Sequence, residues 1–178
     1  MSQVRTNSLV PAGGIPAGAS GGGIIQCVST TKTDTFSTSS SSFTDITGLS
    51  VTITPRSTSN KLLITGFVSI GPGYDTNTAV IIDVNGTSVG KADAAGSRQQ
   101  AHTTLSYYHL SNPVYVMFPL PLNFLYSPSS TSAQTVKLRI VQGDDSGVTT
   151  FVNRSSNDTN DVWLSRGVST LTVLEVSG

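Results

Sequence analysis

The chain has 178 residues, with ten basic side chains balanced by ten acidic ones, and charged residues make up only 11% of the total. Serine and threonine together number 51, whereas glutamate occurs once, at Glu175. This composition excludes a helical bundle or a coiled coil, because strong helix formers are scarce and β-branched and turn-forming residues are plentiful. The zero net charge also argues against nucleic-acid binding, which needs a basic surface.

The first 23 residues differ in composition from the rest. The stretch from Val10 to Gly23 consists almost entirely of glycine, alanine and proline, which cannot form a helix or bury much surface. We therefore expect an extended arm over residues 1–23, which docks along a neighbouring molecule, followed by one domain over residues 24–178. This beginning lacks the apolar core of a signal peptide, so we expect cytosolic synthesis. The alternative for the arm is a flexible linker.

From Ile24 onward the sequence predicts short strands separated by turns. The clearest is Lys61 to Ile70, in which apolar side chains alternate with a second set on the opposite face. Asn85-Gly86 predicts a type I′ turn inside a hairpin. The expected strands lie at 23–31, 43–54, 61–70, 78–90 (the hairpin), 101–110, 114–118, 123–126, 135–141, 148–153 and 167–176.

These strands predict an all-β fold, an antiparallel β-sandwich of the jelly-roll type with the arm at its N-terminus. The last strand is apolar on both faces, since Leu171 and Val173 point one way and Leu174 and Val176 the other. It must therefore be central in a sheet or buried between subunits. The longest apolar run, residues 114–126, contains Pro119 and Pro121 and is too short to cross a bilayer, so no membrane insertion is expected.

Several patterns resemble catalytic sites but lack the required context. Residues 86–92 have three residues between their glycines, where a phosphate loop needs four. The Gly-x-Ser-x-Gly pattern of a nucleophile elbow occurs around Ser20 and Ser88. An elbow needs a strand before the serine and a helix after it, whereas Ser20 falls in the arm and Ser88 in a hairpin. His102 and His109 are seven residues apart, which places them on opposite faces of a strand, so we expect structural roles. Cys27, the single cysteine, is expected to be an inert core thiol.

Two loops supply oxygen atoms that could bind calcium. The candidates are Asp144, Asp145, Asp158 and Asp161. The same residue types form turns, and turn formation is the interpretation that we favour, so that no metal or other cofactor is predicted.

Aromatic side chains offer a second kind of binding site, stacking against sugar rings. The alternative is burial in the core or at a subunit contact, which is commoner for aromatic residues in a small sandwich. The residues concerned are Tyr74, Tyr107, Tyr108, Tyr115, Tyr126 and Trp163.

Three stretches, taken in order, are similar to a known family. They are Gly22-Gly-Ile-Ile-Gln-Cys-Val-Ser-Thr-Thr-Lys-Thr-Asp-Thr-Phe-Ser, then Thr44-Asp-Ile-Thr-Gly-Leu-Ser-Val-Thr-Ile-Thr-Pro, and Ser57-Thr-Ser-Asn-Lys-Leu-Leu-Ile. Together with the ending Ser169-Thr-Leu-Thr-Val-Leu-Glu-Val, they resemble a β domain of bacteriophage tail-fibre and other virion structural proteins, notably those of cyanophages. The resemblance covers residues 22–178, and the order of the motifs is more distinctive than any one of them.

The resemblance implies a non-enzymatic virion component, often a homotrimer, with other capsid or tail proteins as partners and no catalytic residue. Because only a short arm precedes the domain, we expect a capsid decoration or cement protein, or a short fibre or knob. Our working hypothesis is a three-fold contact through the last strand, with the arm on a neighbour. The expected interface residues are Val10, Ile15, Ile24, Ile25, Leu171, Val173, Leu174 and Val176.

Two other functions stay open. One is a receptor- or glycan-binding tip that recognises a host surface glycan through loops such as 71–76 and 142–148. The other is a glycan hydrolase, which is disfavoured because it needs two acidic groups in one cleft and the chain has a single Glu and few paired Asp residues.

Overall fold

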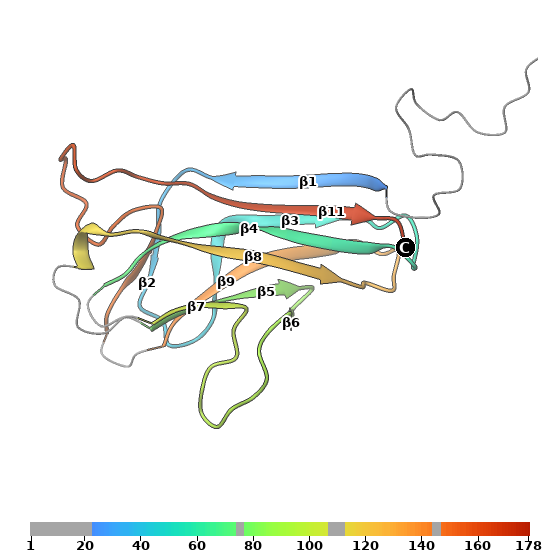
Figure 1. Ribbon diagram of the computed structural model, residues 1–178, viewed down its shortest axis with the longest axis horizontal. Helices are drawn as coiled ribbons and strands as arrows, with labels where there is room; N and C mark the ends of the chain where they lie inside the picture. Colours follow the sequence, from blue (N-terminus) through green and yellow to red (C-terminus); the bar gives the residue numbers. More distant parts are fainter. Residues whose placement is uncertain (1–22, 74–76, 107–112, 144–146) are drawn as a thin grey trace, which may run out of the picture.

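The computed structural model describes residues 23–73, 77–106, 113–143 and 147–178. It is built from antiparallel strands in two stacked sheets, and the long strands of both sheets run along the length of the molecule (Figure 1). The all-β antiparallel sandwich predicted from the sequence is confirmed. Among the described residues, no helix is long and apolar enough to span a membrane.

The first sheet, sheet A, contains six strands. Its bounds are β1 Ile24–Lys32, β2 Phe36–Thr38, β4 Lys61–Gly71, β8 Phe118–Tyr126, β10 Thr150–Val152 and β11 Ser169–Val176. The second, sheet B, contains β3 Thr44–Ile53, β5 Asn77–Val84, β6 Thr87–Val89, β7 Thr103–Ser106 and β9 Gln134–Gln142. A short 3₁₀ helix, η1, spans Pro113–Tyr115.

The pairing of the longer strands is nested. β1 pairs with β11, β3 with β9, β4 with β8 and β5 with β7, so the first strand pairs with the last and the middle strands pair with each other. Further pairs, β11 with β4 and β9 with β5, join these units into the two sheets. This nested order agrees with the jelly-roll type expected from the sequence.

One continuous core fills the space between the sheets. The alternation read from the sequence of β4 is confirmed, because Leu62, Ile64, Val68 and Ile70 are fully buried while the residues between them are half-buried. β5 is buried on both faces: its outer residues Ala79 and Ile81 form a second small cluster with Ala101, Val141 and Phe43. Ala101, near the end of the loop after β6, thus packs on the outer face of sheet B, whereas residues 91–99 of the same loop are exposed.

β11 is one of the two central strands of sheet A. It lies between β1 and β4, which decides between the two readings of its doubly apolar sequence in favour of a central strand. Leu171 and Val173 are fully buried in the core of the same chain, whereas Leu174 and Val176 are half-buried on the outer face. The chain's own core therefore accounts for the apolar inner face of β11, whereas the apolar outer face is only partly covered.

The region 113–126 differs from the prediction of two short strands. It consists of η1 followed by the single strand β8, which includes Pro119 and Pro121. The N–H of Asn123 points away from β4, since it donates to the Nε2 atom of His102. Pro119 and Pro121 occupy equivalent alternate positions, where no N–H is needed for the ladder with β4. The prolines thus fit an edge strand without breaking it.

Other predictions are confirmed with small shifts in the strand ends. The Asn85-Gly86 turn has the positive φ values, 50° and 87°, that a type I′ turn requires. The short strand β2, which pairs with β10, was not predicted because it lies in a hydroxyl-rich run. The expected arm and the interface residues Val10 and Ile15 lie outside the described residues.

Gly66 allows β4 and β11 to approach each other closely. Its φ is 153°, and a Cβ atom placed there would overlap the backbone carbonyl of Thr170. We predict that Gly66→Ala lowers the free energy of unfolding by about 2–4 kcal/mol, because the two central strands must separate locally. Denaturant unfolding measures this.

Gly96→Ala is the matched control, since Gly96 also has a positive φ, 61°, but nothing lies within 4 Å of the added atom. That variant should lose only about 1 kcal/mol from backbone strain. Equal losses in the two variants would show that the close approach of the strands is unimportant.

Candidate functional site

The outer face of sheet A carries a band of apolar side chains that crosses four strands. Cys27 lies opposite Leu174, Leu174 opposite Leu63, and Leu63 opposite Leu125. Next to this row, Ile24 lies opposite Val176. We call these six residues the outer band: Ile24, Cys27, Leu63, Leu125, Leu174 and Val176.

The outer band is accessible over much of its area. Ile24 is 65% exposed and Leu125 is 51% exposed, and Cys27 is also exposed. The expectation that Cys27 is a core thiol is therefore wrong, because Cys27 lies on the face of β1 that points away from sheet B. Contiguous exposed apolar surface is typical of interaction sites in proteins.

A bulge at the start of β1 places Ile24 in the band. The register shifts between Ile24 and Gln26, so that Ile24 faces Val176 and Ile25 is the extra residue. Of the interface residues predicted from the sequence, Ile24, Leu174 and Val176 thus lie together, with the half-buried Ile25 beside them. Leu171 and Val173 are enclosed by the chain's own core and are not available to a partner.

A buried carboxylate fixes the end of the sandwich beneath the outer band. The side chain of Glu175 accepts hydrogen bonds from Gln26 Nε2 and Asn60 Nδ2, both at 2.5 Å, and from the Arg56 backbone N–H at 2.6 Å. Burial alone would raise the pKa of Glu175, but these bonds, with one from the Ser57 backbone, hold the pKa below its ordinary value of 4.5. Glu175 thereby joins β11 to β1 and to the loop before β4, and it serves structure.

We predict that Glu175→Gln lowers the free energy of unfolding at neutral pH by about 1.5–3 kcal/mol, because hydrogen bonds to a charged acceptor are lost and an amide N–H₂ then faces other donors. The native pKa is lowered, so the unfolded chain takes up the proton first on acidification. The advantage of the wild type is therefore complete above pH 4.5 and shrinks as the pH falls through the native pKa. Denaturant unfolding between pH 7 and pH 3 measures the difference.

Asp45→Asn is the control, since Asp45 is a half-exposed carboxylate paired with Lys137 at 2.9 Å. Its effect should be much smaller, because exposed ion pairs contribute little. A similar loss in both variants would contradict the special role of Glu175.

The candidate site residues His102, Asp158 and Asp161 are engaged in structural contacts. His102 bridges the two sheets, with Nδ1 2.7 Å from the Gly90 carbonyl and Nε2 accepting from Asn123, as the predicted structural role requires. Asp158 accepts two hydrogen bonds from Arg166, the shorter at 2.7 Å, and Asp161 accepts from the Trp163 backbone N–H. His109, Asp144 and Asp145 lie outside the described residues.

These contacts involve both described residues of the candidate calcium loops, Asp158 and Asp161. No group of three or more metal-binding side chains occurs among the residues that the structure describes. The Arg166 guanidinium, together with that of Arg154 at 3.7 Å, already balances the charge of Asp158. The loop 153–168 is therefore held by ion pairs and turn hydrogen bonds.

The same loop presents an exposed tryptophan. Trp163 is 84% exposed and its neighbour Val162 is 87% exposed. Tyr115 is about half exposed, and Tyr126 is partly buried against the core. Tyr74, Tyr107 and Tyr108 fall outside the described ranges. The aromatic residues that the structure describes thus differ widely in exposure, from Tyr126 beside the core to Trp163 on the surface.

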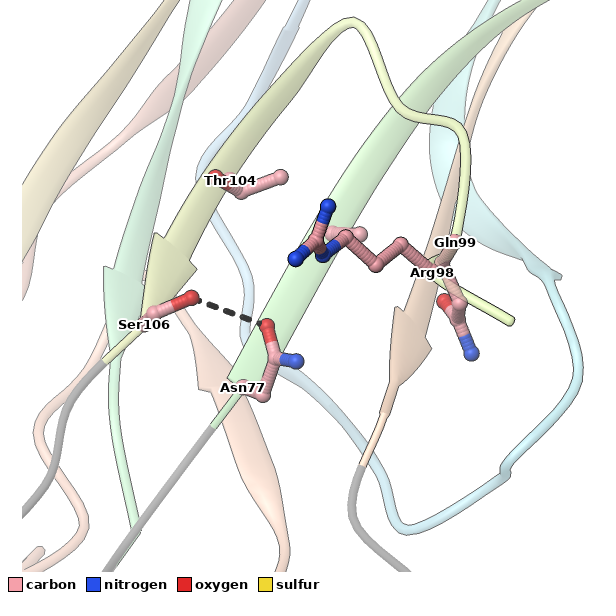
Figure 2. A pocket seen from close by; sticks show the side chains of 6 residues that line it. Asn77, Arg98, Gln99, Thr104 and Ser106 are labelled. Carbon is pink, nitrogen blue, oxygen red and sulfur yellow. Dashed lines mark hydrogen bonds between the residues drawn. The ribbon is translucent and has the colours of Figure 1, made fainter. Parts of the chain in front are cut away.

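A polar hollow of about 330 Å³ lies at the beginning of β5. Figure 2 shows the Arg98 side chain reaching from its loop across the hollow, while Ser106 donates a hydrogen bond to Asn77 at 3.1 Å. Ala79, Gln99 and Thr104 complete the lining. None of the ion pairs among the described residues involves Arg98.

The hollow lies where the two loops predicted to bind glycans begin or end. Asn77 directly follows residues 74–76 and Gly143 directly precedes residues 144–146. The Gly143 N–H donates to the Asn77 carbonyl at 2.6 Å, so the described flanks of the two loops are adjacent. Sequence reasoning placed the loops but missed Arg98, which comes from a third segment without any motif.

Neither a protein-family model nor a curated protein matches the chain. Among solved structures, it is similar to the VP2 subviral particle of infectious bursal disease virus, with 18% identity, a TM-score of 0.43, and coverage of 85% of this chain and 40% of that one. The Gx strain structure of this virus gives 17% identity, a TM-score of 0.44, and coverage of 85% and 39%.

T=1 particles derived from infectious bursal virus provide a further similar structure. It has 13% identity, a TM-score of 0.43, and coverage of 98% of this chain and 44% of that one. The chain thus spans about two fifths of the length of these viral proteins.

Proposed function

We propose that the protein is a non-enzymatic structural component of a bacteriophage virion, either a capsid decoration or cement protein or a short fibre or knob. In this proposal copies of the chain, in a homotrimer or another closed oligomer, bind one another and further capsid or tail proteins. The motifs that resemble phage virion β domains support the assignment to a virion. The observation that carries the proposed assembly is the exposed outer band on sheet A.

The arrangement of the described polar side chains agrees with a structural role. The one glutamate is enclosed under four donors, and His102 joins the two sheets through both ring nitrogens. In contrast, the six apolar side chains of the outer band lie together on a surface that faces solvent. Covering such a surface is favourable by roughly 25 cal/mol per Å², which favours association over catalysis as its purpose.

We predict that the purified chain is an oligomer, with a native mass at least twice the 18.5 kDa of one chain. The variant Ile24→Thr/Leu125→Thr should shift toward the monomer, because two exposed apolar contacts are replaced by residues that keep β-propensity. Light scattering after size-exclusion chromatography measures both. Val168→Thr is the matched control, since Val168 is 41% exposed outside the band and should leave the mass unchanged.

The virion assignment itself is tested in particles of the virus whose genome encodes the chain. The protein should sediment with purified particles at a fixed copy number, and its density should be visible in their reconstruction. If the protein is an oligomer but is absent from particles, the proposed self-association stands and the virion role is wrong. If it is a monomer and is absent from particles, both proposals are wrong.

The second candidate is a receptor- or glycan-binding tip, and the Arg98 hollow is the observation that favours it. A guanidinium without an ion-pair partner in the described chain, beside amide and hydroxyl groups, suits a carboxylate-bearing sugar. We predict saturable binding of acidic rather than neutral glycans on an array. Arg98→Ala should weaken it at least about tenfold, in keeping with the loss of a charge-assisted hydrogen bond.

Lys91→Ala is the control for charge alone, because Lys91 is an exposed cation near the start of the loop that carries Arg98 and does not line the hollow. Equal losses in the two variants would indicate general electrostatic attraction. Absence of any glycan binding would leave the structural role as the function of the protein.

A further inference from the structure

The outer band is narrow and runs across the strands. The neighbouring row on the same face is polar throughout: it consists of Ser29, Thr172, Thr65 and Asn123. On the other side of the band, Val176 lies opposite the exposed Lys61. The apolar surface is therefore only one to two side chains wide, which fits a single extended segment laid across the sheet better than the broad face of another sheet.

The chain enters the sandwich at the edge of this band. The Gly23 carbonyl accepts a hydrogen bond from the Ser177 N–H at 3.0 Å, and Ile24 is the first residue of β1. The start of β1 and the end of β11 lie at the same end of the molecule (Figure 1). Residues 1–22 are thus attached directly beside the outer band.

The sequence of residues 1–22 is suited to such a surface. It contains Leu9, Val10 and Ile15 among glycine, alanine and proline, and it has no acidic residue. An extended segment of this length reaches up to about 70 Å, whereas four strands measure about 15 Å across. Gly21, Gly22 and Gly23 give the backbone freedom to turn toward its own sheet or toward that of a neighbouring copy.

We propose that the segment Leu9–Ile15 covers the outer band. The segment can cover the band of its own chain or the band of a neighbouring copy. If it covers a neighbouring copy, the inference rests on the proposed function, because the segment is then the contact that joins copies in the particle. If it covers its own chain, the inference is independent of the proposed function, and the experiment below distinguishes the two cases.

Cys27 is a natural probe of the cover, because it is the only cysteine of the chain and lies in the longer row of the band, with Leu174, Leu63 and Leu125. We expect the full-length variant Leu9→Asn/Val10→Asn/Ile15→Asn to react with a thiol reagent such as DTNB about tenfold faster than the wild type, since a covered thiol reacts only from an open state. Circular dichroism and thermal unfolding check that both proteins are folded.

The matched control moves the thiol into the polar row. In Cys27→Ser/Ser29→Cys, the thiol lies two residues along the same strand, on the same face and outside the band. Adding the triple substitution to this control should change the reaction rate of its thiol less than about twofold, because position 29 is uncovered whether or not the segment lies on the band. Unchanged reactivity of Cys27 itself would overturn the proposal.

Disulfide trapping identifies which copy supplies the segment. Val10→Cys or Ile15→Cys, in the chain that keeps Cys27, should form a disulfide under mild oxidation, and the control with Cys27→Ser should not. A cross-linked dimer indicates a neighbouring copy and supports the proposed assembly as well. An internal disulfide in a monomer supports the cover and counts against assembly through the band. An oligomer without either cross-link keeps the proposed function and overturns this inference.

Discussion

The insertion of the last strand between β1 and β4 is the constraint on which the rest of the structure depends. It completes sheet A, places Leu171 and Val173 in the core, and aligns Leu174 with Cys27 and Leu63 on the outer face. One strand thus supplies both the packed interior and the exposed apolar surface. Its apolar residues therefore lie on both faces, one face in the core and the other in the outer band.

Side chains close the two long sides where the sheets would otherwise separate. On one side, Gln26 and Thr30 of β1 donate to the backbone carbonyls of Thr54 and Gly48 near β3, at 2.7 and 3.1 Å. On the other side, His102 joins the segment before β7 to β8. The prolines of β8 further protect its free edge, because they offer no N–H to another strand. The faces of the sandwich are therefore better placed for association than its edges.

Periodicity allowed much of the fold to be predicted from the sequence. The alternation in Lys61 to Ile70 and the Asn85-Gly86 turn identified strands and a hairpin correctly, because both signals are local. The failures have physical causes as well. Proline usually ends a strand, yet Pro119 and Pro121 are accommodated at an edge, and the polar strand β2 is formed only through its pairing with β10.

The candidate surface was harder to predict than the fold. Leu174 and Val176 were identified from the sequence, but the register that aligns Leu63 and Leu125 with them depends on pairing between strands far apart in the chain. The exposure of Cys27 follows from the face of β1 on which it lies, which composition does not reveal. Arg98 reaches its hollow from a loop whose path no motif specifies.

The pairing of the first strand with the last has a consequence for biosynthesis. β1 is synthesised long before β11, and until β11 is in place β1 has only the side chains of β3 beside it and β4 lacks one of its neighbours. Contacts so distant in sequence form slowly. An intermediate without β11 would therefore expose the apolar inner face of β4 at the gap in sheet A.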